Sequence, residues 1–222
     1  MQDNLVPYTP NGTAVQQSGD KSLAVIAQPG SNIYINNPPM GPSAAQPRIP
    51  AQPSARQLMD IASFSSDYYQ LIVTTQKDVF DVNIVHMMTS RALCRGYVPD
   101  IIFETCSSLS PEGIAALKRM PAVICNENTD NNGKTDPSQM ATYARVKAIL
   151  PSHGIIDIVF EPIAVFPQEK MCEPLAAAYF GLTMNCCITT LNHTAWYVMQ
   201  RNLFDAFREA GIEGMPGPEQ GC

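Results

Sequence analysis

Two alternating stretches on either side of a short turn constrain this fold more than any other feature of the sequence. Over residues 142–150, and again over 156–160, side chains of one kind occupy every second position. Side chains of a β-strand point to opposite faces in turn, so a spacing of two is typical of half-buried strands. Residues 151–154, Pro-Ser-His-Gly, form a turn sequence. The pattern predicts a β-hairpin over 141–166, with a helix capped by residues 136–139 as the alternative for its first half.

The remaining apolar segments predict a mixed sheet packed against helices, and therefore an α+β domain over residues 57–212. Buried strands are expected at 68–75 and 122–125, because both are short apolar runs. A further strand is plausible at 101–103. Residues 79–88 fit either a strand or the start of a helix, because polar side chains interrupt their apolar residues.

Two helices are expected to cover this sheet. Ser-Pro-Glu at 110–112 supplies a capping serine, a proline at the first helical position and an acid in the first turn, so a helix is predicted over 111–119. A C-terminal amphipathic helix is predicted over 194–210, with Gly211 as its stop. Its apolar residues recur at helical spacing: Trp196, Met199, Leu203, Ala206, Phe207 and Ala210.

The ends of the chain differ from this domain in composition. Residues 1–20 are polar and are predicted to be a disordered tail, as are residues 213–222. Residues 37–56 contain six prolines, which favours an extended, semi-rigid linker. Between them, residues 21–36 hold two short β-prone runs around a Pro-Gly-Ser turn, and this arrangement predicts an isolated β-hairpin.

An isolated hairpin is marginally stable in water and needs something to pair with. We therefore expect residues 21–36 to bind a protein partner or to mediate self-association into an oligomer. Four apolar side chains of this segment are the candidate interaction residues: Val25, Ile33, Tyr34 and Ile35.

Composition and charge limit the partners and the cellular locations that fit this sequence. The formal net charge is −6 and only 15% of residues are charged, which makes nucleic acid an unlikely partner. No apolar segment resembling a secretory signal occurs in residues 1–20, and 174–200 is too interrupted by polar residues to span a membrane. The seven cysteines are odd in number and are expected to be free thiols. These features predict a cytoplasmic protein without membrane contact.

No motif in the sequence predicts catalysis, a metal or a cofactor. There is no Cys-x-x-Cys pair, no phosphate-binding glycine motif and no Gly-x-Ser-x-Gly. Of the three histidines, His86 is interpreted as a core residue, His153 as a solvated turn residue and His193 as a neutral imidazole near a helix start. A hydrolase with a Cys/His or Asp/His pair remains an alternative.

The polar loop 126–136 is the best candidate rim of a ligand site, because function concentrates on loops held by a rigid scaffold. It lacks the carboxylate register of a calcium loop. Together with one face of the strand at 141–150, it predicts a surface for a ligand or nucleotide. The candidate residues are Glu127, Asn128, Asp130, Lys134, Asp136, Tyr143, Arg145 and Lys147.

Short stretches of this sequence resemble components of bacterial conflict systems. Asn-Ile-Tyr-Ile-Asn-Asn at 32–37 resembles the Asn-rich β segments that precede effector-associated modules. The stretch from Asn-Glu-Asn at 126–128, through Asn-Leu-Phe at 202–204, to Ala-Gly-Ile at 210–212 resembles an antiphage-type accessory domain. The resemblance implies a bacterial or phage origin and an accessory role, and it implies no catalytic residue.

Taken together, these features predict a non-enzymatic interaction or adaptor module that assembles through its N-terminal hairpin. The first alternative is a ligand- or nucleotide-sensing domain that uses the loop 126–136 and the strand face. The second is the hydrolase with an unrecognised active site.

Overall fold

The computed structural model describes residues 54–96, 98–184 and 187–218 of the chain. Contacts divide the chain into two units, Met1–Pro42 and Ser43–Cys222, and every described residue belongs to the second. The fold below is therefore that of the second unit.

The predictions for the N-terminal arm concern residues outside the described ranges. They are the tail 1–20, the hairpin 21–36 and the linker 37–56 up to residue 53. The four candidate interaction residues also fall there: Val25, Ile33, Tyr34 and Ile35.

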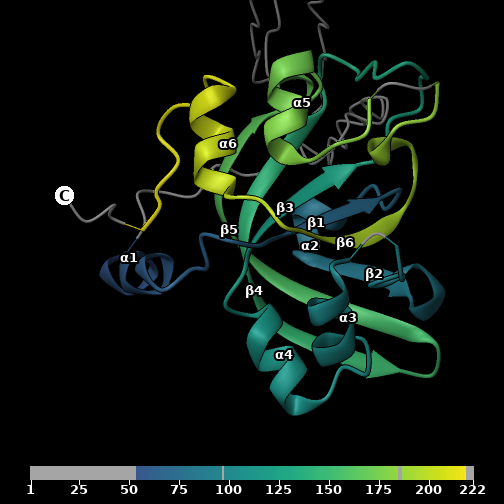
Figure 1. The fold of residues 1–222 in the computed structure, drawn as a ribbon, viewed down its shortest axis with the longest axis vertical. Helices are drawn as coiled ribbons and strands as arrows, with labels where there is room; N and C mark the ends of the chain where they lie inside the picture. Colours follow the sequence, from purple (N-terminus) through teal and green to yellow (C-terminus); the bar gives the residue numbers. More distant parts are fainter. Residues whose placement is uncertain (1–53, 97, 185–186, 219–222) are drawn as a thin grey trace, which may run out of the picture. The chain divides into compact units, whose positions relative to one another are not determined.

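A six-stranded mixed sheet organises the described residues, as the α+β prediction requires (Figure 1). Its strand order is β2-β5-β4-β3-β1-β6, and among its neighbours only β1 and β3 run parallel. The strands are β1 (Tyr69–Thr74), β2 (Ile84–Met88), β3 (Pro121–Asn126), β4 (Met140–Ser152), β5 (Ile155–Pro167) and β6 (Ala195–Met199).

Helices cover both faces of the sheet and create two hydrophobic cores (Figure 1). The α-helices are α1 (Ala55–Ala62), α2 (Val79–Val82), α3 (Asp100–Cys106), α4 (Pro111–Leu117), α5 (Pro174–Phe180) and α6 (Leu203–Glu209). Residues of α1, α5 and α6 pack with Leu71 and Val73 of β1, whereas α2, α3 and α4 pack with Ile72 between them. Alternate side chains of one strand thus point into opposite cores. None of the described helices has the length and apolarity needed to cross a bilayer.

The hairpin predicted over 141–166 is confirmed by β4 and β5. The two strands pair from Met140 and Pro167 to Ser152 and Ile155. His153 and Gly154 connect them with φ angles of 44° and 87°. Two successive positive φ values are typical of a type I′ turn, whose twist matches that of the flanking strands.

The helix predicted over 194–210 is wrong in its first half. Residues Ala195–Met199 form strand β6 against β1, and α6 begins only after Asn202, whose side chain accepts hydrogen bonds from the backbone of Phe204 and Asp205. Ala-Trp-Tyr-Val-Met is rich in aromatic and β-branched side chains, and both of its faces are buried, so its apolar residues fit a strand between two cores. The second half is confirmed, because α6 packs its apolar face onto the sheet.

The structure also decides what three further segments form, namely residues 101–103, 79–88 and 213–218. The strand considered at 101–103 is wrong, because these residues belong to α3, where Pro99 stands at the N-cap and Asp100 in the first turn. Residues 79–88 divide into α2 and β2, with Asn83 in the left-handed conformation between them. Residues 213–218, predicted as part of a disordered tail, carry no helix or strand, yet Met215 packs against the core.

Candidate functional site

The first place to look for a ligand site is where the parallel strands β1 and β3 end. In sheets with parallel strands, ligands commonly bind outside the carboxyl ends of those strands. The two strands finish side by side at Thr74 and Asn126, and the backbone N–H of Glu127 donates to the carbonyl of Thr74 at 2.9 Å. The polar loop that follows β3 therefore begins from a fixed position.

Two amide side chains, those of Gln168 and Asn192, hold this loop in place. Gln168 is fully buried, and its Nε2 donates to the carbonyl of Asn126 at 2.8 Å and to Oδ1 of Asn128 at 2.9 Å. From the other side, Nδ2 of Asn192 donates to the carbonyls of Asn128 and Asp130, both at 2.8 Å. The loop is thus bonded to two separate segments of the chain, which restricts its conformation.

The loop forms one wall of a polar hollow of about 550 Å³. The opposite wall comes from the start of α5 and the 3₁₀ turn Gln168–Met171 before it. Four carboxylates and one ammonium group line the hollow, namely Asp130, Asp136, Glu169, Glu173 and Lys134. Hydrogen bonds from Ser138 lower the pKa of Asp136. The hollow therefore carries an excess of negative charge, which disfavours a nucleotide.

The structure brings together only part of the predicted ligand site. Asp130, Lys134 and Asp136 line the hollow, as the sequence led us to expect of loop residues. Asn128 also belongs to the loop, but its side chain is buried. Glu127 accepts a hydrogen bond from Oγ1 of Thr194 at 2.6 Å and is not among the residues that line the hollow.

The three strand residues predicted to complete that site do not line the hollow. Tyr143 is completely buried among aromatic residues of the core, and burial raises its pKa. Arg145 forms an ion pair with Asp60 of α1. Because residues of α1 and α6 pack around Tyr143, that side chain is not available to a ligand. Lys147 instead pairs with Glu161 on the neighbouring strand at 3.4 Å.

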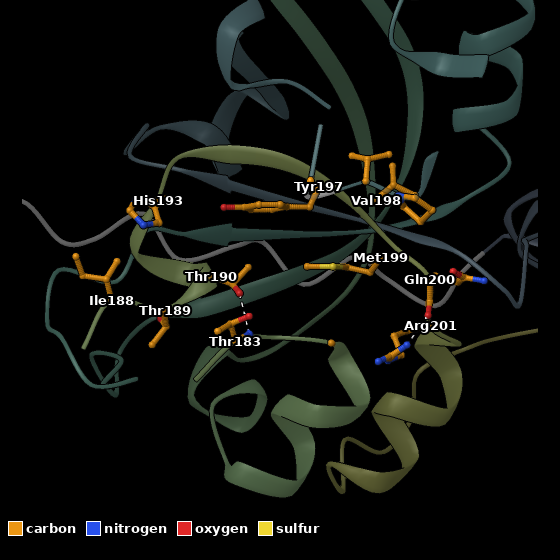
Figure 2. A pocket seen from close by; sticks show the side chains of 14 residues that line it. Thr183, Ile188, Thr189, Thr190, His193, Tyr197, Val198, Met199, Gln200 and Arg201 are labelled. Atoms are coloured by element: carbon orange, nitrogen blue, oxygen red, sulfur yellow. Dashed lines mark hydrogen bonds between the residues drawn. The ribbon is translucent and has the colours of Figure 1, made fainter. Parts of the chain in front are cut away.

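A second hollow, which sequence reasoning missed, runs beside β6 (Figure 2). It has a volume of about 520 Å³ and is lined by segments 96–99, 181–190 and 193–201, of which 97 and 185–186 lie outside the described residues. The described residues that line it include no Asp or Glu, whereas Arg201 and His193 are among them. We call this hollow the β6 groove. The segment 96–99 is distant in sequence from the other two, so no local pattern could have indicated the groove.

The β6 groove lies along one margin of the sheet, because β6 is an edge strand. The outer edge of β6 is partly covered, since the N–H of Leu93 donates to the carbonyl of Trp196 at 2.9 Å. That bond fixes the carbonyl of Trp196 as pointing away from β1. Backbone groups of a strand repeat their direction every second residue, so those of Val198 also turn away from β1, beside the groove that Val198 helps to line.

The opposite margin of the sheet, strand β2, is closed by a side chain. Nε2 of Gln76 donates to the carbonyl of Ile84 at 3.0 Å, and Oε1 of Gln76 accepts from the N–H of His86 at 3.1 Å. One amide therefore bonds to two backbone groups in the way that a neighbouring strand would. Such a capped edge cannot readily pair with another chain.

The three histidines lie on different elements. His86 on β2 pairs through Nδ1 with Asp157 on β5 at 2.7 Å, and both side chains are substantially exposed, at 56% and 40%. His153 lies in the β4–β5 turn, and His193 beside the β6 groove (Figure 2). Over residues 54–218, apart from 97 and 185–186, no group of three or more potential ligands is placed to hold a metal ion.

Comparison with known proteins returned no match. No family model fits this sequence, and neither a curated protein nor a solved structure is significantly similar to it. The resemblance to conflict-system accessory domains therefore remains a prediction.

Proposed function

We propose that this chain is a non-enzymatic interaction module that binds an extended polypeptide segment along the outer edge of β6. The single observation that carries the proposal is the position of the β6 groove, which lies beside an edge strand. Peptides commonly bind at such an edge by adding a strand to the sheet, with backbone hydrogen bonds giving affinity and side-chain pockets giving specificity.

The contrast between the two sheet edges supports this choice. At β2, Gln76 already occupies two of the backbone groups that an incoming strand would use, the carbonyl of Ile84 and the N–H of His86. At β6, Ala92 after η1 (Thr89–Arg91) bridges to Trp196, and the strand continues beyond this bridge along the groove. Of the two edges of the described sheet, β6 is therefore the one to which an incoming segment would pair.

The lining of the groove also suits a peptide. Tyr197 and Met199 offer apolar surface, while Thr183, Thr190 and Gln200 offer polar groups along the same hollow (Figure 2). Recognition sites typically combine a largely apolar lining with a few polar groups that fix orientation. An extended segment with alternating apolar side chains matches this composition.

Photo-crosslinking tests the proposal directly. A photoreactive phenylalanine analogue at Gln200, an exposed residue of the groove, should crosslink to polypeptide when the full chain is expressed in cells. Val198→Pro removes one backbone donor that faces the groove but leaves the bonds to β1, and should abolish the crosslinks. Val198→Ala keeps the donor and is the matched control. Crosslinks that persist unchanged in Val198→Pro would contradict strand addition.

A small-ligand function is the second candidate, and the rigid loop around the polar hollow favours it. Because carboxylates dominate the lining, we propose a positively charged ligand such as an alkyl amine or a guanidine. A thermal-shift screen of such compounds should show stabilisation that Asp130→Asn with Asp136→Asn removes. If millimolar amines produce no shift in the wild-type protein, this candidate fails.

A further inference from the structure

We infer that the segment bound in the β6 groove carries an Asp or Glu side chain whose carboxylate pairs with the guanidinium of Arg201. This inference rests on the proposed function, because it specifies the chemistry of the segment that the same groove would bind. It concerns selectivity. Apolar side chains alone would admit many β-prone segments, whereas a required charge limits which of them bind.

The charge of the groove differs from that of the chain as a whole. The chain has 20 acidic and 14 basic residues and a formal net charge of −6. Among the described residues that line the groove there is no Asp or Glu, and Arg201 is the only Lys or Arg. A carboxylate that enters the groove therefore meets one permanent positive charge and no opposing carboxylate from this lining. A Lys or Arg at the same point of the segment would be repelled.

The guanidinium of Arg201 has donors available for such a pair. Arg201 is exposed, and its Nη1 donates to the carbonyl of the preceding residue, Gln200, at 2.9 Å. None of the ion pairs between described residues includes Arg201, whereas Arg145 and Arg208 both pair with carboxylates. A guanidinium carries five N–H donors in a planar fork that suits a carboxylate. The bond to Gln200 therefore leaves donors for a ligand.

The helix beside Arg201 positions its side chain. Gly181, at the C-cap of α5 with a φ of 74°, lies so close that an added Cβ would be 3.3 Å from Cγ of Arg201. Figure 2 shows Arg201 at one end of the groove and His193 at the other. Arg201 follows Val198 by three residues, and a strand rises about 3.3 Å per residue. The acid should therefore stand about three residues along the segment from the position that pairs with Val198.

A side-chain carboxylate fits this position better than the carboxylate at the end of a partner chain. A side chain can reach Arg201 whether the segment runs parallel or antiparallel to β6. A terminal carboxylate can do so only in the parallel direction, because Arg201 follows the C-terminal end of β6.

A display selection with the full chain provides the test. The probe is a library of randomised segments of about ten residues, the length of a long strand. Each segment is followed by the same polar tail, so none presents a terminal carboxylate. Segments captured by the wild-type protein should share an acid at a fixed distance from an alternating apolar run. Arg201→Gln should capture the apolar run without the acid. Arg119→Gln removes the same charge at an exposed site outside the groove lining and should still select the acid.

Fluorescence anisotropy then measures the pairing with one selected segment and a version in which the acid is replaced by its amide. The replacement should weaken binding to the wild-type protein about fivefold, as expected of an exposed ion pair. It should leave binding to Arg201→Gln unchanged, and the difference should shrink at high salt. A cation at a helix C-terminus also stabilises that helix. If Arg201 served α5 alone, Arg201→Gln would weaken the binding of both versions equally.

Two results overturn the inference, namely capture of segments without a preferred acid by the wild-type protein, and an acid preference that persists in Arg201→Gln. In either case, segments that Val198→Pro no longer captures bind by strand addition, so the proposed function stands. If acid-bearing segments depend on Arg201 but bind Val198→Pro equally well, the charge recognition is supported and strand addition fails. Capture of no segment overturns the inference, and crosslinking from Gln200 then decides the proposed function by itself.

Discussion

Two buried tyrosines, Tyr69 and Tyr143, differ in whether their hydroxyl groups are hydrogen-bonded, and this difference can be tested by substitution. The hydroxyl of Tyr69 donates to the carbonyl of Phe180 at 2.6 Å within the core. The hydroxyl of Tyr143 is also buried, yet it has no hydrogen-bond partner among the residues that the structure describes. Replacing each tyrosine with phenylalanine removes one oxygen and leaves the ring in place. We expect Tyr69→Phe to destabilise the protein and Tyr143→Phe to stabilise it.

The expected magnitudes follow from what each hydroxyl leaves behind. The carbonyl of Phe180 lies in the last turn of α5, where carbonyls lack partners within the helix. Tyr69→Phe would leave it buried and unpaired, at a cost of about 2 kcal/mol. Tyr143→Phe removes an unpaired buried hydroxyl and should gain about 1 kcal/mol. Its edge-on contact with Phe207, with ring centroids 5.4 Å apart, is retained.

Equilibrium unfolding measures both changes. Trp196 is the single tryptophan of the chain and is fully buried, so its fluorescence follows unfolding in urea. The two variants should shift the midpoint in opposite directions with unchanged slope. A difference of about 3 kcal/mol between them corresponds to about 6–12 °C in Tm for a chain of this length. If Tyr143→Phe loses 1 kcal/mol or more, its hydroxyl has a partner and the reasoning is refuted.

Three further predictions concern a close contact, a capped edge and a buried thiol. Gly113→Ala should cost about 1–3 kcal/mol in urea unfolding, because an added Cβ would lie 2.7 Å from the carbonyl oxygen of Thr105 on the adjacent helix. Gln76→Ala should cost about 1–2 kcal/mol and cause concentration-dependent association in size-exclusion chromatography. An elution volume equal to that of the wild-type protein at every concentration would show that the cap does not protect β2. Burial raises the pKa of Cys125, so its stabilising contribution is complete below the unfolded thiol value near 8.5 and declines as pH rises above it. Cys125→Ala should therefore flatten the fall in Tm between pH 8 and 10, and an unchanged pH profile would exclude this thiol as a cause.

Local patterns predicted the elements whose signals are contained within them. The β4–β5 hairpin follows from an alternation of two and from the turn that includes His153 and Gly154. The start of α4 follows from Ser110, whose Oγ accepts from the N–H of Gly113 as a capping residue does. In these cases the residues that determine the structure lie within a few positions of each other.

Tertiary pairing decided the elements that the sequence did not predict. Trp196 and Met199 stand three apart, as on a helix, yet their segment pairs with β1, which is more than 120 residues earlier in the chain. Burial on both faces of a strand removes the alternation that would otherwise identify it. The β6 groove had no local signal either, because it exists only where the segments around Val98, Thr183 and Arg201 converge.

For the candidate ligand site, the loop was predicted better than the strand face. Polar residues between two strands must leave the core, so the exposed positions of Asp130 and Asp136 followed from composition. The burial of Tyr143 depends on α1 and α6, whose packing on β4 cannot be inferred from that strand alone. Arg145 likewise finds its partner, Asp60, in an element 85 residues earlier.

The amide of Gln76 limits how large any assembly of this chain can become. A fibril grows without end only when each added copy exposes an unpaired strand edge to which the next copy can pair. Among the described strands, β2 and β6 are the two edges of the sheet, and Gln76 caps the edge at β2. Two copies that paired through β6 would cover both of their uncapped edges, so assembly through the described sheet should stop at pairs. A single glutamine thus protects this sheet from open-ended polymerisation.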